Sequence, residues 1–255
     1  MGQRKNQVRI EVYADSARMG QAAAAAAAEI VAAGVASRGS ARIVIGTGPS
    51  QNTVIGALVR LPSLDWSRVE VFHLDEYVGI SPDHPASFRH WLKNRVTDVV
   101  HPAGVHYLNG DAADPEAECR RYAGLLDAAP VDVTFLGFGE NGHIAFNDPG
   151  VADFADPLLV RRVRLVESCR AQQVGEGHFA NLDAVPPEAL TITCTGIMRS
   201  RHLVCSVPER RKAQAVLGAV EGPLSTDCPA SLAMTHPRAL LFLDAGSASL
   251  LSRPS

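Results

Sequence analysis

Acidic and imidazole side chains stand at points where buried strands are expected to end. Asp75 and Glu76 come directly after the apolar run Val69–Leu74, and His143 lies in the glycine-rich segment Gly137–Pro149, which comes after another apolar run. Open α/β sheets keep their active sites at the carboxyl ends of the strands. Carboxylates and imidazoles placed there can move protons in a reaction.

The pair Asp75-Glu76 has two interpretations. An acidic pair after a strand commonly caps a helix or faces water. Two adjacent carboxylates can also push each other's pKa values apart, which leaves one of them ionised and basic. The spacing alone leaves both interpretations open.

His143 is the only side chain of its segment that can gain and lose a proton near neutral pH. Gly137, Gly139 and Gly142 permit a tight backbone and a close approach to a substrate. A lone histidine is nevertheless structural more often than catalytic, so further support is needed for a proton-transfer role.

Two segments could bind an anion. Gly48 and Ser50 belong to the run IGTGPS, which joins a strand pattern to a helical pattern, and backbone N–H groups at such a turn favour a phosphate. The run lacks the spacing of a P-loop or of a dinucleotide fingerprint. Lys212 lies in PERRKA at the start of a predicted helix, where the helix dipole disfavours a cation unless an anion sits beside it.

Strand and helix patterns alternate along the chain, which predicts a three-layer, doubly wound (Rossmann-like) α/β fold with a mainly parallel sheet and helices on both faces. Asp15 or Ser16 should cap a first helix that contains a run of seven consecutive alanines, Ala22–Ala28, and ends near Gly34 or Gly39. Further strands are expected at Val8–Val12, Arg42–Ile45, Val69–Leu74, Val131–Leu136, His202–Val207 and Ala239–Leu243, and helices at Asn52–Leu61, Ser87–Val99, Pro115–Asp127 and Arg210–Val220.

We expect a single domain over residues 1–255 because this length suits one α/β core. Residues 150–187 are rich in loop signals, so they could fold over the site as a lid.

Net charge is −3, from 24 basic and 27 acidic residues spread along the chain, which predicts no nucleic-acid or membrane partner and favours a small-molecule ligand. The five cysteines form no C-x-x-C pair, so we expect reduced thiols, no metal site and a cytoplasmic location. Residues 1–6 contain no apolar signal core, and no apolar run of about 20 residues is expected to span a membrane. Assembly into a homo-oligomer remains open.

The two acidic and glycine-rich motifs, DEYVG at 75–79 and GFGENGHIAFNDP at 137–149, resemble those of the glucosamine-6-phosphate deaminase family, which shares a fold with 6-phosphogluconolactonases. The resemblance runs from about Ile43 to Asp244. It implies an amino-sugar-phosphate isomerase and deaminase without cofactor or metal, which converts glucosamine 6-phosphate and water to fructose 6-phosphate and ammonia.

The resemblance also implies roles for individual residues. Asp75 would abstract the C2 proton of the open-chain sugar, and His143 would move the proton that opens the ring. Gly48, Ser50 and Lys212 would hold the sugar phosphate.

Three positions depart from the family pattern. Asn141 stands where an aspartate is usual, and Asp148 replaces a glutamate, so that its shorter carboxylate is expected to reach His143 only through a water. We still count Asn141 and Asp148 among the catalytic residues, with Asp75 and His143. The lid arginine that binds phosphate in the family has no clear counterpart; His178 is the nearest candidate, with Arg170 further off.

Two rival interpretations remain. A 6-phosphogluconolactonase would share the phosphate site and the histidine, but Tyr77, Phe146 and Asn147 match the deaminase motifs instead. The departures at Asn141 and Asp148, together with the missing lid arginine, would suit a sugar-phosphate sensor without catalytic activity.

Overall fold

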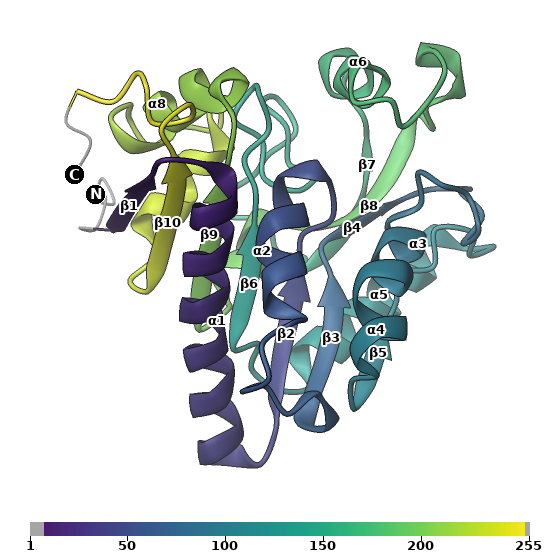
Figure 1. Cartoon of the computed structure of the whole chain (residues 1–255). Coiled ribbons are helices and arrows are strands. Elements are labelled where there is room, and N and C mark those ends of the chain that lie inside the picture. Colours follow the sequence, from purple (N-terminus) through teal and green to yellow (C-terminus); the bar gives the residue numbers. More distant parts are fainter. Residues whose placement is uncertain (1–7, 253–255) are drawn as a thin grey trace.

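Seven parallel strands form the main sheet of the computed structural model, which describes residues 8–252 (Figure 1). In spatial order the strands are β1 (Arg9–Tyr13), β10 (Ala239–Asp244), β9 (His202–Val207), β6 (Val133–Leu136), β2 (Ala41–Ile45), β3 (Val69–His73) and β5 (Gly104–His106). The predicted strands are confirmed to within two residues, and the short edge strand β5 was not predicted. The expectation of no signal core at residues 1–6 lies outside the described residues.

Helices cover both faces of this sheet, as predicted for a doubly wound fold. Alternate residues of β2 face opposite ways: Ile43 and Ile45 pack toward α1 (Ser16–Arg38) and α2 (Asn52–Leu58), whereas Val44 joins the core of the other face. That second core includes side chains of α5 (Pro115–Asp127), α7 (Cys194–Met198) and α8 (Ala213–Val220). The inner strands are therefore buried on both sides, which explains their continuous apolar runs.

Helix α1 has the predicted cap and end. The Asp15 carboxylate accepts a hydrogen bond from Arg18 N at 2.8 Å, and Gly39 ends the helix in the left-handed conformation. Its 23 residues are long and apolar enough to cross a membrane by length and composition, contrary to our expectation from the sequence. Core helices pass the same test, and Ala23, Ala24 and other residues of α1 are fully buried in the fold.

The remaining helices match the predictions to different degrees. Helix α5 has the predicted limits, and α2 ends three residues early. The predicted helix Ser87–Val99 is instead three pieces: α3 (Phe88–Leu92), a π-helical turn (Lys93–Thr97) and α4 (Asp98–Val100). The predicted helix Arg210–Val220 begins with a 3-10 turn, η5 (Arg210–Lys212), before α8. The other 3-10 turns are η1 (Pro49–Gln51), η2 (Trp66–Arg68), η4 (Leu182–Ala184) and η6 (Pro229–Thr235).

A second, antiparallel sheet was not predicted. It contains β4 (Asp75–Tyr77), β8 (Glu188–Ile192) and β7 (Val160–Arg164), in that order. Asp75 and Glu76 therefore begin a new strand, and both are buried, so the interpretation as an exposed pair is wrong. The interpretation as a helix cap holds in part, because Glu76 accepts hydrogen bonds from the first N–H groups of α3. This sheet carries α6 (Glu167–Gly175), which stands away from the main sheet in Figure 1.

Residues 150–187 contain β7, α6 and η4, so much of the segment has regular structure. Its movement as a lid stays a prediction.

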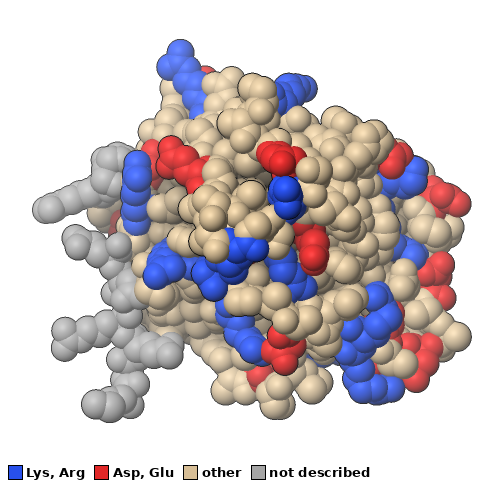
Figure 2. Space-filling model, turned by 90° about the horizontal axis from the view of Figure 1, so that it is seen from below, with Lys and Arg blue, Asp and Glu red and all other residues tan. Residues whose placement is uncertain are grey.

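Figure 2 views the molecule from below, at the amino-terminal ends of the main strands. Basic and acidic side chains are mixed across this surface.

Tyr122 ties α5 to the end of β3, just before Asp75. Its fully buried hydroxyl accepts a hydrogen bond from His73 N at 2.9 Å and donates one to His73 O at 2.8 Å. Tyr122→Phe should lower the free energy of unfolding by about 1–3 kcal/mol because two buried backbone groups lose their partner. Urea unfolding measures the loss. Tyr107→Phe, which removes a half-buried hydroxyl bonded to Thr97, is the control and should cost less; equal losses would contradict this role of Tyr122.

Candidate active site

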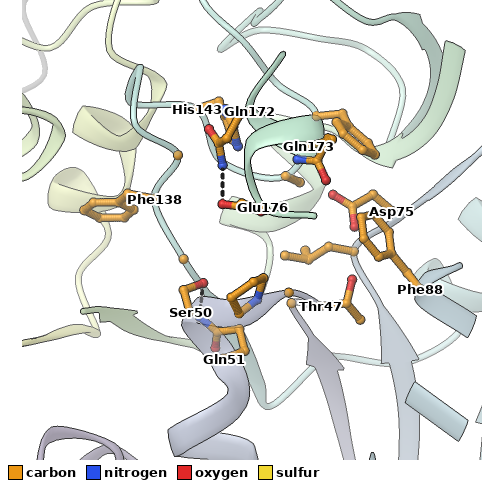
Figure 3. Close-up of a pocket in the computed structure, with 18 of the residues that line it drawn as sticks. Thr47, Ser50, Gln51, Asp75, Phe88, Phe138, His143, Gln172, Gln173 and Glu176 are labelled. Atoms are coloured by element: carbon orange, nitrogen blue, oxygen red, sulfur yellow. Dashed lines mark hydrogen bonds between the residues drawn. The ribbon is translucent and has the colours of Figure 1, made fainter. Parts of the chain in front are cut away.

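The segments that come after β2, β3, β6 and β9 meet in one pocket, and α6 borders it (Figure 3). Figure 3 shows Asp75 and His143 on separate walls of this pocket. The structure thus brings together six of the predicted site residues: Gly48, Ser50, Asp75, His143, His178 and Lys212. Asn141 and Asp148 contact His143 instead of lining the pocket.

Asp75 is a buried carboxylate at the pocket wall. Its residue is 7% exposed. Burial, followed by the neighbouring charge of Glu76, raises the pKa of Asp75 well above its ordinary value of 3.8. A carboxylate with a raised pKa is a stronger base once it is ionised. Asp75 is therefore suited to take a proton from carbon.

Glu76 has a structural role instead. Its carboxylate accepts hydrogen bonds from Ser87 Oγ at 2.7 Å and from the backbone N–H groups of Tyr77, Phe88 and Arg89 at 2.9–3.1 Å. Burial raises the pKa of Glu76, and these hydrogen bonds oppose that shift. The two adjacent acids therefore differ: one stabilises the start of α3, and the other faces the pocket.

His143 is held by two neighbours through its Nδ1 atom. Nδ1 lies 2.8 Å from Asn141 Oδ1 and 3.2 Å from Asp148 Oδ1. The expectation that Asp148 needs a bridging water is wrong, because the turn of the loop brings its carboxylate into direct contact. Since both neighbours present acceptors, Nδ1 carries the proton and Nε2 is left to accept one.

Asn141 also orders the carboxylate of Asp148, to which its Nδ2 donates a hydrogen bond at 2.8 Å. Burial alone would raise the pKa of Asp148, but the hydrogen bond and charge of His143, together with Asn141, lower it. The negative charge absent at position 141 is thus present at Asp148.

One group of ligand atoms could hold a metal ion. Its three atoms lie within 4.8 Å of one another: a ring nitrogen of His143, a carboxylate oxygen of Asp148 and the sulfur of Cys169. Burial raises the pKa of the Cys169 thiol, which keeps it protonated, and the thiol is hydrogen-bonded to Asp148. A neutral thiol is a poor metal ligand, so hydrogen bonding is the simpler explanation of this cluster.

A further part of the pocket lining is suited to an anion. Gly48 has φ of +130°, which only glycine adopts readily, and it precedes Ser50 in η1. Lys212 is 3% exposed, and burial lowers its pKa, although the charge of Glu176 opposes the shift. A cation that has lost its water gains most from a bound anion.

His178 and Arg170, the two candidates for the missing lid arginine, are now distinguished. His178 lines the pocket, with its Nε2 3.7 Å from a carboxylate oxygen of Glu176. Arg170 is bonded to the backbone oxygens of Leu182 and Val185. His178 is therefore the better placed of the two.

Several lining residues were not predicted from the sequence, among them Thr47, Gln51, Gln172, Gln173, Glu176 and Arg211. Thr47 and Arg211 lie in the two predicted anion-binding runs and could have been found there. The side chains from α6 are not placed after a strand end, so the signal we used could not find them.

Comparisons with known proteins show the family of this chain. A family model described as glucosamine-6-phosphate isomerases/6-phosphogluconolactonase matches residues 14–242. A glucosamine-6-phosphate deaminase of an Arthrobacter species is 38% identical over 89% of this chain and 88% of its own length, and one of an Exiguobacterium species is 40% identical over 73% and 72%.

Solved structures give the same result. A monomeric glucosamine-6-phosphate deaminase superposes with a TM-score of 0.86 at 31% identity, covering 95% of this chain and all of that one. A 6-phosphogluconolactonase from Shewanella baltica superposes with a TM-score of 0.79 at 19% identity, covering 94% and 99%. The second likeness shows the shared fold alone.

Gly139 makes room for the His143 ring: a Cβ atom there would lie 2.2 Å from the ring atoms Cε1 and Nδ1. Gly139→Ala should displace the ring and lower the free energy of unfolding by about 1–3 kcal/mol. Gly124→Ala, in α5 and without a neighbour within 4 Å, is the control and should stabilise the protein by about 0.4–1 kcal/mol. Urea unfolding measures the stability of both variants, and the NMR signals of His143 report the position of its ring. Unchanged His143 signals in Gly139→Ala would contradict the packing argument.

Proposed function

Because the chain belongs to the glucosamine-6-phosphate isomerase and 6-phosphogluconolactonase family, we propose that it is a glucosamine-6-phosphate deaminase. The reaction converts glucosamine 6-phosphate and water to fructose 6-phosphate and ammonia. Relatives with this name have sequence identities of 32–40% to this chain over most of its length. The observation that carries the proposal is the buried Asp75, whose raised pKa suits a base that acts on carbon.

Ring opening is the first step. The sugar binds as a closed ring, so a proton must leave the hydroxyl on C1 and reach the ring oxygen. His143 faces the pocket with Nε2 free to accept that proton and to return it. Asp148 stabilises the imidazolium formed in between, because its carboxylate lies 3.2 Å from Nδ1.

Isomerisation and deamination come next. Asp75 takes the proton from C2 of the open-chain aldehyde, which gives an enolamine, and the proton is returned to C1. The product is an imine at C2. Addition of water to that carbon and departure of ammonia give the ketone, so the overall change is a hydrolysis.

Binding of the phosphate fixes the sugar between the two proton-transfer groups. Gly48, Ser50, His178 and Lys212 all line the pocket. We assign the phosphate to these four residues and call them the phosphate end. Holding a substrate by a non-reacting group lowers the entropic part of the barrier.

The lactonase alternative needs no C2 base. The raised pKa of the buried Asp75 suits removal of a proton from carbon, and lactone hydrolysis contains no such step. The sensor alternative depended on a weakened histidine, whereas Asp148 contacts His143 directly. Both observations favour the deaminase.

Incubation with glucosamine 6-phosphate should release ammonia, and 6-phosphogluconolactone should not be hydrolysed.

Asp75→Asn should slow exchange of the C2 hydrogen with deuterated solvent, followed by NMR, by about 10²–10⁴-fold. Sugar-phosphate binding should persist because the phosphate end is untouched. Asp83→Asn, exposed and outside the pocket lining, is the control. Exchange at the native rate in Asp75→Asn would exclude Asp75 as the base.

The pH profile tests the state of Asp75. A base works only without its proton, so kcat/KM should fall as the pH drops through the raised pKa of Asp75, above the ordinary value of 3.8. Glu76→Gln removes the adjacent negative charge and should move this acid limb to lower pH. Asn141→Asp, which adds charge beside His143, serves as the comparison. If only Asn141→Asp moves the limb, His143 sets it and the assignment to Asp75 is wrong.

A further inference from the structure

A carboxylate occupies the end of the pocket that we assign to phosphate. Glu176 comes directly after α6, and its side chain is only 9% exposed. Its oxygens lie 2.9 Å from Gln172 Nε2, 3.1 Å from Arg211 Nη1 and 3.7 Å from His178 Nε2. Figure 3 shows Glu176 beneath Gln172 and facing the interior of the pocket. A carboxylate there would repel a phosphate dianion.

The main partner of Glu176 is Arg211. This guanidinium lines the pocket beside Lys212 and also contacts Glu140 at 2.9 Å and Glu209 at 2.6 Å. Three carboxylates therefore surround one arginine, more than its single charge can balance. If Glu176 leaves, Arg211 keeps its two other carboxylate partners.

Lys212 depends on the same carboxylate. It is the more deeply buried cation, at 3% exposure, and Glu176 is the largest of the charges that favour its protonated form. While the pocket is empty, Glu176 thus supplies the negative charge that Lys212 and Arg211 need. A bound phosphate would supply the same charge.

We propose that Glu176 is a resident anion at the phosphate end, that substrate phosphate displaces it, and that Arg211 then becomes the second guanidinium or ammonium contact of the phosphate beside Lys212. The inference rests on the proposed function, since it concerns the phosphate end of the same site. It also accounts for the missing lid arginine: the second strong cation is Arg211, which comes from η5 and not from the lid segment.

A purely structural role for Glu176 makes a different prediction. If its ion pair with Arg211 served only to hold α6 against η5, loss of its charge would loosen the pocket and weaken anion binding. Under the proposal, loss of that charge removes a competitor and strengthens anion binding.

Binding of inorganic phosphate, measured by isothermal titration calorimetry at one pH and ionic strength, separates the two. Glu176→Gln should tighten binding by roughly threefold to tenfold because a nearby like charge is gone. Its control is Glu140→Gln, which removes another of the carboxylate charges that contact Arg211. Glu140 does not line the pocket, so this change should have a smaller effect.

Arg211→Ala should weaken phosphate binding by roughly tenfold, the lower end for a charge-assisted contact, because the side chain is 33% exposed. Arg210→Ala, the exposed neighbour outside the pocket lining, should bind as the native protein does. Lys212→Ala is the positive control for loss of a phosphate contact.

Unchanged or weaker binding by Glu176→Gln would overturn the proposal, as would native binding by Arg211→Ala. The titration needs no turnover, so it does not depend on ammonia release. A native protein that releases no ammonia but shows the expected binding pattern would refute the deaminase and leave the anion exchange standing. Ammonia release without that pattern would refute the anion exchange alone.

Discussion

The crossing from β3 to β4 is the constraint on which the site depends. Leu74 belongs to both sheets through its backbone: its N–H donates to Ile45 O at 3.2 Å, and its carbonyl accepts from Ile192 N at 2.8 Å. The chain therefore leaves the main sheet and enters the second sheet without a loop, and two carboxylates in succession are buried. Burial of a charge is costly unless hydrogen bonds compensate it. Glu76 receives four such bonds, whereas the charge of Asp75 is destabilised by burial and by Glu76, which makes it reactive.

Two of the three non-glycine residues with positive φ in the described part of the chain lie in the segments that carry the other site residues. Ala145, two residues after His143, has φ of +50°, and Glu209, just before η5, has φ of +79°. A residue with a side chain pays about 1–3 kcal/mol for such a conformation. The strain at Glu209 is offset by a hydrogen bond from its N–H to Asp244 at 2.9 Å. Both segments are thus held in place by the surrounding fold instead of by local preference.

Features that depend on local patterns could be predicted from the sequence. Apolar periodicity was enough for the buried parallel strands, residue type for the Asp15 cap, and strand ends for the meeting of Asp75 and His143. The place of Lys212 followed from its charge at a helix start and from the family resemblance. The second sheet could not be predicted, because β4 has only three residues and its partner β8 lies more than a hundred residues away. The direct contact of Asp148 with His143 depends on how the loop turns, which side-chain length does not reveal. Glu176 was missed because its position depends on where the second sheet carries α6.

The aromatic residues of the two motifs act through packing. Tyr77 is fully buried, its ring lies 5.3 Å from that of Phe146 and 5.0 Å from that of Phe88, and its hydroxyl donates to Gln173 at 2.7 Å. Phe88 and Phe146 both line the pocket beside Asp75. An apolar wall of this kind removes water from the carboxylate, and desolvation is the largest cause of its raised pKa. On a fold shared with lactonases, these rings therefore provide the environment in which Asp75 can act as a base on carbon.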